Sequence, residues 1–251
     1  MKATALEFRL RYLIHLVIFF LGFTAPWDRF LHLDAGRSTW LLLAAWPARN
    51  HWLTFSAATV ALLLIGALCA LAAAILRTWG SAYLGASIVK SPAMHGDGVL
   101  AAGPYRHLRN PLYLGTFIHT LALALLMPPS GAIFCILAIA ILQLRLIAGE
   151  EAFLTTQLGE PYLAYCAKVP RLFPAITAKV PASASKPTWP TAFLGEIYFW
   201  GVAISFAVVG WRYNAFLIIQ GVIISLGISL IARVFIPQAI GKSQNDEPAA
   251  S

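Results

Sequence analysis

Two apolar segments, 111–127 and 132–148, flank a Pro-Pro-Ser-Gly run at 128–131, and this arrangement constrains the fold more than any other feature. The run is typical of a tight turn, and each segment is long enough to cross a bilayer as a helix. Asn110 and Glu150 each lie about 20 residues from the turn, at ~1.5 Å per helical residue. The hairpin is therefore predicted to return both residues to the same membrane face.

The composition indicates a polytopic membrane protein of the all-α class. Of the 251 residues, 59% are hydrophobic and 11% are charged, whereas a soluble domain carries about 25% charged residues. Four further apolar segments lie at 10–26, 52–76, 193–210 and 214–234. Together with the hairpin, they predict about six transmembrane helices.

Three other stretches carry structural predictions. Residues 10–26 are expected to be a retained signal anchor, because Pro26 blocks the likeliest cleavage position. The apolar piece at 40–47 is too short to span and is flanked by tryptophans, which favours an interfacial or re-entrant segment. Residues 81–110, which include Gly96 and Asp97, are predicted to form a long functional loop, and residues 150–174 a helix that begins with the glutamates.

The positive charge predicts how the chain is oriented. The net charge is +8, but the basic residues are spread through loops, so we expect no nucleic-acid partner. With six spans, four of the eighteen Lys and Arg residues fall on one side and the other fourteen on the opposite side. The positive-inside rule then predicts that both termini, the glycine-rich loop and the glutamate pair face the cytoplasm, in an inner membrane of bacterial type.

Cysteine and histidine residues indicate neither a disulfide framework nor a metal site. The three cysteines, Cys69, Cys135 and Cys166, are widely separated, and the six histidines show no ligand spacing to another His, Cys or carboxylate. We therefore expect no metal.

The basic run 103–115 stands directly before the first arm of the hairpin. Pro111 is suited to the first turn of a helix, where its missing N–H costs nothing. The free N–H groups at such a helix start, together with Arg109, would suit a carboxylate or phosphate. The alternative is a positive-inside anchor with turn prolines.

Several short motifs occur in an order that resembles a known family. They are Gly-Pro-Tyr-Arg at 103–106, Arg-Asn-Pro-Leu-Tyr at 109–113, Glu150-Glu151, Leu-Gly-Glu-Pro-Tyr-Leu-Ala-Tyr at 158–165 and Val-Pro-Arg-Leu-Phe-Pro at 169–174. This set resembles the C-terminal half of the isoprenylcysteine carboxyl methyltransferase and phospholipid methyltransferase superfamily of integral membrane enzymes, over roughly 77–174. The family usually has Arg-His-Pro where this chain has Asn110, and Asn cannot titrate near neutral pH.

The resemblance implies S-adenosyl-L-methionine as the cofactor, in a pocket that faces the cytoplasm. The chemistry of this cofactor assigns Glu150 to its ammonium group, Arg109 to its carboxylate, and Tyr105 or Tyr113 to its adenine. The resemblance also implies that Arg145 lies nearer the substrate and that Glu151 either binds the cofactor or acts as a base. It carries the cofactor contacts over to Val99, Leu100, Tyr105, Asn110, Pro111, Leu112, Tyr113 and Glu150.

The acceptor is expected to be a lipid-like or prenylated molecule, because the site is embedded in lipid. Carboxyl O-methylation is favoured, since a carboxylate is already ionised, whereas an amine or thiol must first lose a proton. Phospholipid N-methylation and a catalytically degenerate protein of the same fold are the alternatives. A small transporter is disfavoured, because the chain shows no internal repeat and its charges gather at one face.

These predictions divide the chain into five parts. We expect the C-terminal transmembrane hairpin either to shape access of the acceptor or to form the surface of a homodimer. The parts are an N-terminal transmembrane region at 1–76, a methyltransferase core at 77–174, a linker at 175–192, a C-terminal transmembrane hairpin at 193–236 and a tail at 237–251.

Overall fold

The computed structural model describes residues 2–31, 33, 37–85, 88, 89 and 98–236. Within these ranges the secondary structure is helical and contains no β-strand, which confirms the all-α prediction. The predicted tail at 237–251, together with Gly96 and Asp97 of the predicted loop, lies outside the described residues.

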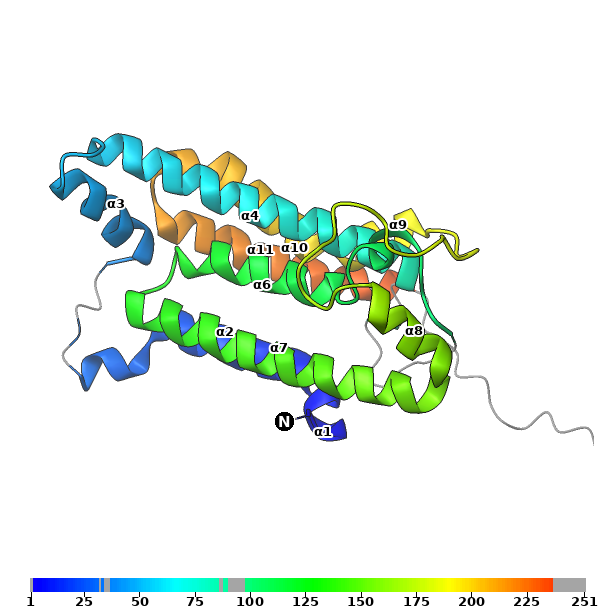
Figure 1. The fold of residues 1–251 in the computed structure, drawn as a ribbon. Helices are drawn as coiled ribbons and strands as arrows, with labels where there is room; N and C mark the ends of the chain where they lie inside the picture. Colours follow the sequence, from blue (N-terminus) through cyan, green and yellow to red (C-terminus); the bar gives the residue numbers. More distant parts are fainter. Residues whose placement is uncertain (1, 32, 34–36, 86–87, 90–97, 237–251) are drawn as a thin grey trace, which may run out of the picture.

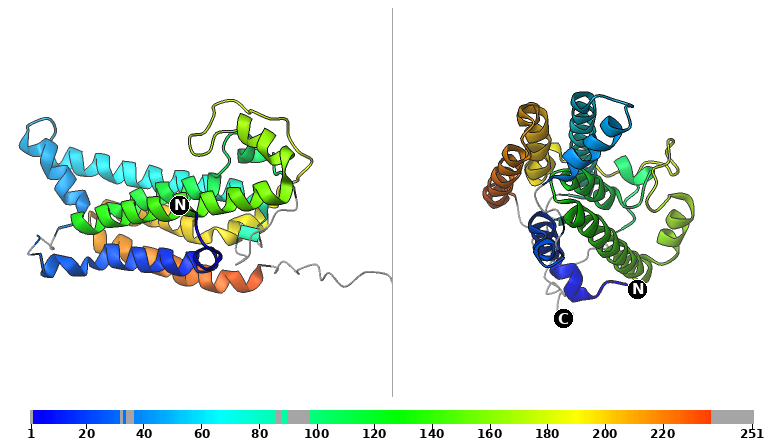
Figure 2. Two further views of the ribbon diagram at one scale, coloured as in Figure 1. Left: turned by 60° about the horizontal axis from the view of Figure 1, so that its bottom comes forward. Right: turned by 90° about the vertical axis from the view of Figure 1, so that its left-hand side faces the viewer.

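The long helices run beside one another and form an elongated bundle (Figure 1). α3 lies at one end of the bundle, and α8 and α9 lie at the other, which we call the site end (Figure 1). Viewed along the bundle, the C-terminal helices (orange) and α8 (yellow-green) lie on opposite sides (Figure 2). The helices are α1 (Ala5–Arg9), α2 (Arg11–Thr24), α3 (Thr39–Arg49), α4 (Phe55–Leu84), α6 (Pro111–Ala124), α7 (Pro129–Leu158), α8 (Glu160–Lys168), α9 (Trp189–Gly195), α10 (Ile197–Ile204) and α11 (Ala215–Ala232).

The core joins the hairpin to the N-terminal and C-terminal helices. Leu123 of α6, Ile139 of α7 and Phe206 after α10 are all nearly inaccessible to solvent and belong to one apolar cluster. α2 approaches α7 closely because Gly131 has no side chain; a Cβ there would lie 1.9 Å from the carbonyl oxygen of Gly22. Small residues that allow such backbone approach are typical of helix packing in membranes.

Three helical segments of the described chain are long and apolar enough to cross a membrane: Phe55–Leu84, Pro129–Leu158 and Ala215–Phe235. Trp189–Gly195 and Ile197–Arg212 add a fourth if this pair, bent by 64°, is counted as one broken span. α6 is apolar but has only 14 residues, or ~21 Å of helix. The membrane class is thus supported, and the count of six spans stays a prediction.

The hairpin forms as expected, but its turn lies at 125–128 rather than at 128–131, because α6 ends at Ala124 and α7 begins at Pro129. Two neighbouring boundaries also differ from the prediction. α4 continues to Leu84, so the loop begins at Gly85 rather than at residue 81. The predicted helix from 150 to 174 was wrong, because α7 runs through Glu150 and Glu151 to Leu158. Gly159 then breaks the helix with a φ of +58°, a conformation that glycine adopts without steric cost, and α8 follows.

The short apolar piece near residue 40 becomes α3, which packs across the hairpin turn. The backbone N–H of Thr39 donates to the Met127 carbonyl, and that of Trp40 donates to the Leu125 carbonyl, both at 2.8 Å. The Trp40 indole also donates to the Thr59 carbonyl at 3.0 Å. α3 therefore ties the hairpin turn to the start of α4.

The segment 175–192, predicted as a linker, follows the loop at the site end. Backbone N–H groups of Ala175, Lys179 and Ser183 donate to the carbonyls of His107, Arg106 and Ala101, at 2.8–2.9 Å. The Arg106 side chain donates in return to the Val180 carbonyl at 2.9 Å. These hydrogen bonds hold residues 101–107 against residues 175–183.

Candidate functional site

The basic run and the glutamate pair meet at the site end, as predicted from the equal lengths of the two arms of the hairpin. The Asn110 amide donates to Glu151 Oε1 at 3.3 Å, and the Arg109 guanidinium lies 3.3 Å from the same oxygen. Glu150 lies 21 residues into α7, so ~31 Å of helix separates it from the hairpin turn. This length matches the ~30 Å thickness of a bilayer core.

Glu151 is the centre of this polar cluster. Its side chain is 10% exposed, and its second oxygen, Oε2, lies 2.6 Å from the Arg171 guanidinium. The amide of Asn110 also donates to the Arg171 backbone carbonyl at 3.2 Å. Two guanidinium groups therefore compensate the negative charge, and together with the Asn110 amide they hold the carboxylate in one orientation.

Glu150 faces a different set of neighbours from Glu151. Consecutive residues of a helix point to different faces. The Glu150 side chain lies beside the Tyr113 hydroxyl of α6 and within electrostatic range of Arg11. The two glutamates thus have different partners: Glu151 pairs with Arg109 and Arg171, and Glu150 lies against the first turn of α6.

Arg145 lies on the same helix but pairs with the N-terminal segment. Its guanidinium donates to both carboxylate oxygens of Glu7, at 2.7 and 2.8 Å. Its carbonyl accepts from the Ala3 backbone N–H at 2.9 Å. The described contacts therefore do not join Arg145 to Glu151, and its expected position near the substrate stays a prediction.

The start of α6 leaves backbone donors available. Asn110 precedes the helix but makes no side-chain capping bond, because its amide is directed at Glu151 and Arg171. The N–H groups of Leu112 and Tyr113, in the first turn after Pro111, have no partner within the helix. They can therefore receive an anion at this end of α6.

Two buried side-chain atoms of the same loop have no hydrogen-bond partner among the described residues: the Tyr105 hydroxyl and Arg109 Nε. Burial raises the pKa of the Tyr105 hydroxyl well above its usual value, so the group stays protonated and can donate. The Tyr165 hydroxyl orients the loop by donating to the Tyr105 carbonyl at 2.8 Å. Buried polar atoms without partners are rare. Because both atoms can donate a hydrogen bond, they fit a ligand that offers acceptor oxygens, such as those of carboxylate and hydroxyl groups.

Val99 and Leu100 lie at the edge of this loop and are half-buried. Val99 packs against a small apolar cluster that contains Tyr162, Tyr165 and Val169. The two residues therefore offer an apolar wall beside the polar groups. The structure gathers nearly all predicted cofactor residues at the site end, but whether they bind a cofactor stays a prediction.

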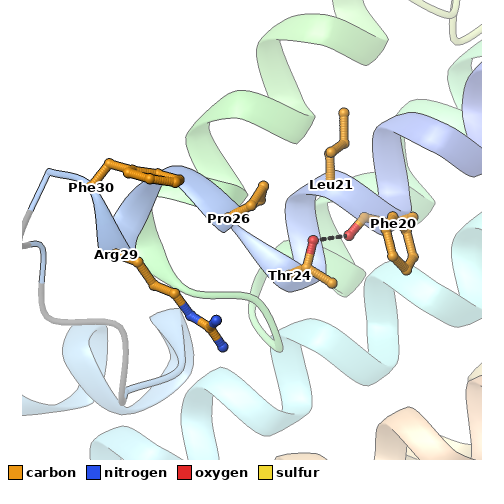
Figure 3. A pocket seen from close by; sticks show the side chains of 6 residues that line it. All are labelled: Phe20, Leu21, Thr24, Pro26, Arg29 and Phe30. Carbon is orange, nitrogen blue, oxygen red and sulfur yellow. Dashed lines mark hydrogen bonds between the residues drawn. The ribbon is translucent and has the colours of Figure 1, made fainter.

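An open pocket of about 420 Å³ adjoins Glu151 and Arg171. Its other lining residues are Lys2, Ala148, Ala152, Thr155 and Thr156. A second pocket, of about 370 Å³, lies at the far end of α2 and is lined by Phe20, Leu21, Thr24, Pro26, Arg29 and Phe30 (Figure 3). Of the two pockets, only the first adjoins the polar cluster, through Glu151 and Arg171, and none of the predicted cofactor contacts is among its lining residues.

Arg171 is the site residue that the sequence predictions missed. It belongs to the Val-Pro-Arg-Leu-Phe-Pro motif, which was noted but given no role. The signal in the sequence was a basic residue within the last of the ordered motifs, shortly after the segment that forms α8. In the described part of the chain, no three His, Cys, Asp or Glu side chains form a group that could hold a metal ion.

Comparison with known proteins gives one match. Residues 56–160 match the family model described as phospholipid methyltransferase. The matched range contains α4, the loop, the hairpin and both glutamates, but ends before Arg171 and the C-terminal helices. No curated protein and no solved structure matches the chain.

Proposed function

Because the chain belongs, through residues 56–160, to the integral membrane methyltransferase superfamily, we propose that it transfers a methyl group from S-adenosyl-L-methionine to a lipid-like or prenylated acceptor. The single observation that carries the proposal is the junction of Asn110 and Arg109 with Glu151 at the site end. This junction brings the start of α6, which can bind an anion, next to the carboxylates of Glu150 and Glu151.

The residues of the site match the charges of this cofactor. The free N–H groups of Leu112 and Tyr113, with Arg109, would hold the methionyl carboxylate, and Glu150 would hold its ammonium group. Tyr105 would donate its unpartnered hydroxyl to the ribose, and Val99 and Leu100 would cover the adenine. When bound, the cofactor supplies an activated methyl group with its own leaving group, so the protein mainly positions the two reactants.

Carboxyl O-methylation is the reaction that the cluster around Glu151 supports best. Its oxygens already accept hydrogen bonds from Asn110 and Arg171 and lie against Arg109, so the carboxylate is occupied by donors of the protein itself. A carboxylate acceptor requires no base, because it is ionised at neutral pH. Glu151 then serves to align Arg109 and Asn110 rather than to remove a proton.

Phospholipid N-methylation is the second candidate, and the description of the matched family favours it. Lys2 and Arg171 on the walls of the pocket suit the phosphate of such an acceptor, and the Glu151 carboxylate suits its amine. The third candidate, a degenerate protein without turnover, rests on Asn110 in place of the histidine usual in the family.

A methyl-transfer assay separates these candidates. Purified protein is supplied with methyl-labelled cofactor and with either prenylated thiol acids or aminolipids. Alkali releases methanol from a methyl ester but leaves a methylated amine intact. We expect alkali-labile label on the prenylated acids; alkali-stable label on the aminolipids would support N-methylation, and no transfer to either would support the degenerate protein.

The proposed site faces the cytoplasm, where the cofactor is made. The side assignment rests on the excess of Lys and Arg at the site end and at both chain ends. The role of the C-terminal helices as a homodimer surface stays a prediction.

A further inference from the structure

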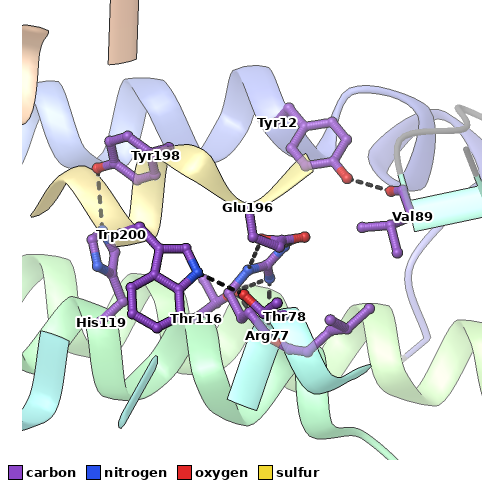
Figure 4. Close-up of polar contacts among 10 residues, drawn as sticks. Tyr12, Arg77, Thr78, Val89, Thr116, His119, Glu196, Tyr198 and Trp200 are labelled. Carbon is purple, nitrogen blue, oxygen red and sulfur yellow. Dashed lines mark hydrogen bonds and ion pairs between the residues drawn. The ribbon is translucent and has the colours of Figure 1, made fainter. Parts of the chain in front are cut away.

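A buried ion pair connects the C-terminal helices to α4. Arg77 of α4 donates from Nε to Glu196 Oε2 at 2.7 Å and from a terminal nitrogen to Oε1 at 3.1 Å (Figure 4). The side chains are only 8% and 0% exposed. Glu196 stands at the break between α9 and α10, where the chain bends by 64°. A charge pair at such a depth is costly unless it is fully satisfied, so its presence calls for a role.

Arg77 has a second set of partners on α6. Its other terminal nitrogen donates to the Leu112 carbonyl at 3.1 Å and to the Thr116 hydroxyl at 2.7 Å. Gly115 makes this crossing possible, because a Cβ there would lie 2.6 Å from the Arg77 side chain. One guanidinium therefore spans three helical segments: α4, the first turn of α6 and the start of α10.

The first turn of α6 is the part of the site that needs the most accurate placement. Its N–H groups can bind an anion only if they converge on one point, and Leu112 contributes one of them. Arg77 fixes the carbonyl of the same residue. The Arg77 guanidinium also lies over the Phe199 ring of α10, 4.3 Å from its centroid, and this contact further limits the movement of the guanidinium.

We propose that Glu196 is a positioning residue for the cofactor site: through Arg77 it holds the first turn of α6 in its binding geometry. This inference rests on the proposed function. It gives the C-terminal helices a role, since Glu196 lies outside the matched residues 56–160 and supplies the counter-charge for an arginine within them. The C-terminal helices therefore complete the methyltransferase core.

The test compares three variants of the full-length protein in detergent. Glu196→Gln removes the charge but keeps the shape of the side chain. Arg77→Gln/Glu196→Gln also removes the uncompensated arginine, which restores a satisfied, neutral interior. Trp200→Phe is the matched control, because the Trp200 indole donates to Thr78 Oγ1 at 2.9 Å, a hydrogen bond between α10 and α4 that does not involve α6.

Two quantities are measured: the affinity for S-adenosyl-L-methionine and the hydrogen exchange of amides 112–118, which requires no cofactor. We expect Glu196→Gln to weaken cofactor binding about tenfold or more, because the N–H groups in the first turn of α6 would no longer be held in the geometry that binds the cofactor. The double variant should recover thermal stability but keep the weak binding and the fast exchange, because one glutamine cannot reach both residue 196 and Leu112. Trp200→Phe should leave the affinity and the exchange of these amides unchanged.

A double variant that recovers both stability and wild-type affinity would overturn the inference, because the pair would then be structural only. Unchanged affinity and exchange in Glu196→Gln, beside wild-type protein that binds the cofactor, would overturn it as well. Wild-type protein that does not bind the cofactor would instead contradict the proposed function, and the inference with it.

Discussion

Asn110 and Glu151 lie 41 positions apart in the chain, yet the amide of the first donates to the carboxylate of the second at 3.3 Å. The bond joins the residue before α6 to the last third of α7, so it closes the open end of the hairpin. Because the turn at 125–128 is held by α3, the two arms cannot slide without breaking this junction. The position of the polar cluster is therefore a consequence of helix length.

Glu150→Gln should lower the affinity for S-adenosyl-L-methionine by roughly 30-fold or more, since removal of one partner of a poorly solvated charge pair costs ~2–5 kcal/mol. The protein should still fold in detergent, because the ion pairs of Arg109 and Arg171 with Glu151 remain. Isothermal titration measures the affinity. Glu160→Gln, at an exposed position at the start of α8, is the control and should bind as wild type. Equal affinities for the two variants would refute the assignment of Glu150.

Asn110→Ala should weaken cofactor binding by about one hydrogen bond, ~0.5–1.5 kcal/mol, because the amide that donates to Glu151 and to the Arg171 carbonyl is lost. Asn110→His should preserve methyl transfer, since histidine retains a donor for Glu151. Turnover of the prenylated and aminolipid acceptors is the measurement. Turnover that occurs in Asn110→His but not in wild type would identify this chain as a degenerate relative.

The membrane class, the hairpin and the junction at its open end could be predicted from the sequence, because each depends on local composition and on the fixed rise of a helix. The boundary at Gly159 was missed although the sequence carries a signal for it, because a glycine followed two residues later by Pro161 is typical of a helix end. The contact of Arg145 with Glu7 was also missed, because it joins residues 138 positions apart that share no motif.

The ion pair between Arg77 and Glu196 is another contact that could not be predicted from the sequence. Arg77 directly follows the apolar segment 52–76, Glu196 lies within the one at 193–210, and neither was given a role. Their distance in space depends on how the C-terminal helices pack against α4, and helix packing is not encoded in any local pattern. Polar contacts between distant helices therefore need the three-dimensional structure.

Topology is the third prediction. In a cysteine-free background, a cysteine at the exposed position Ala184, beside the loop of the site end, should react with a membrane-impermeant reagent from the cytoplasmic side. A cysteine in place of Arg37, near the start of α3 at the other end, should react from the opposite side. Labelling of both positions from the same side would contradict the arrangement.

The contact of Glu7 with Arg145 predicts a response to acid. The hydrogen bond from Arg145 lowers the pKa of Glu7 below its ordinary value of 4.5. A group with a lowered folded pKa stabilises the contact above the unfolded value and loses that contribution as pH falls through the folded value. Residues 3–9 should thus stay protected from hydrogen exchange from pH 8 down to about 5 and lose protection at lower pH.

Glu7→Gln is the control for this fourth prediction, because glutamine does not titrate. Its residues 3–9 should exchange faster than those of wild type at neutral pH and show no further loss of protection in acid beyond that of the chain as a whole. Loss of protection in wild type between pH 8 and about 5 would contradict the role of this carboxylate.

Binding of S-adenosyl-L-methionine to the purified full-length protein in detergent tests the central claim most directly. The account predicts saturable binding that the demethylated product, S-adenosylhomocysteine, displaces, and that Glu150→Gln weakens while Glu160→Gln does not. A folded wild-type protein that shows no saturable binding at millimolar cofactor would contradict it.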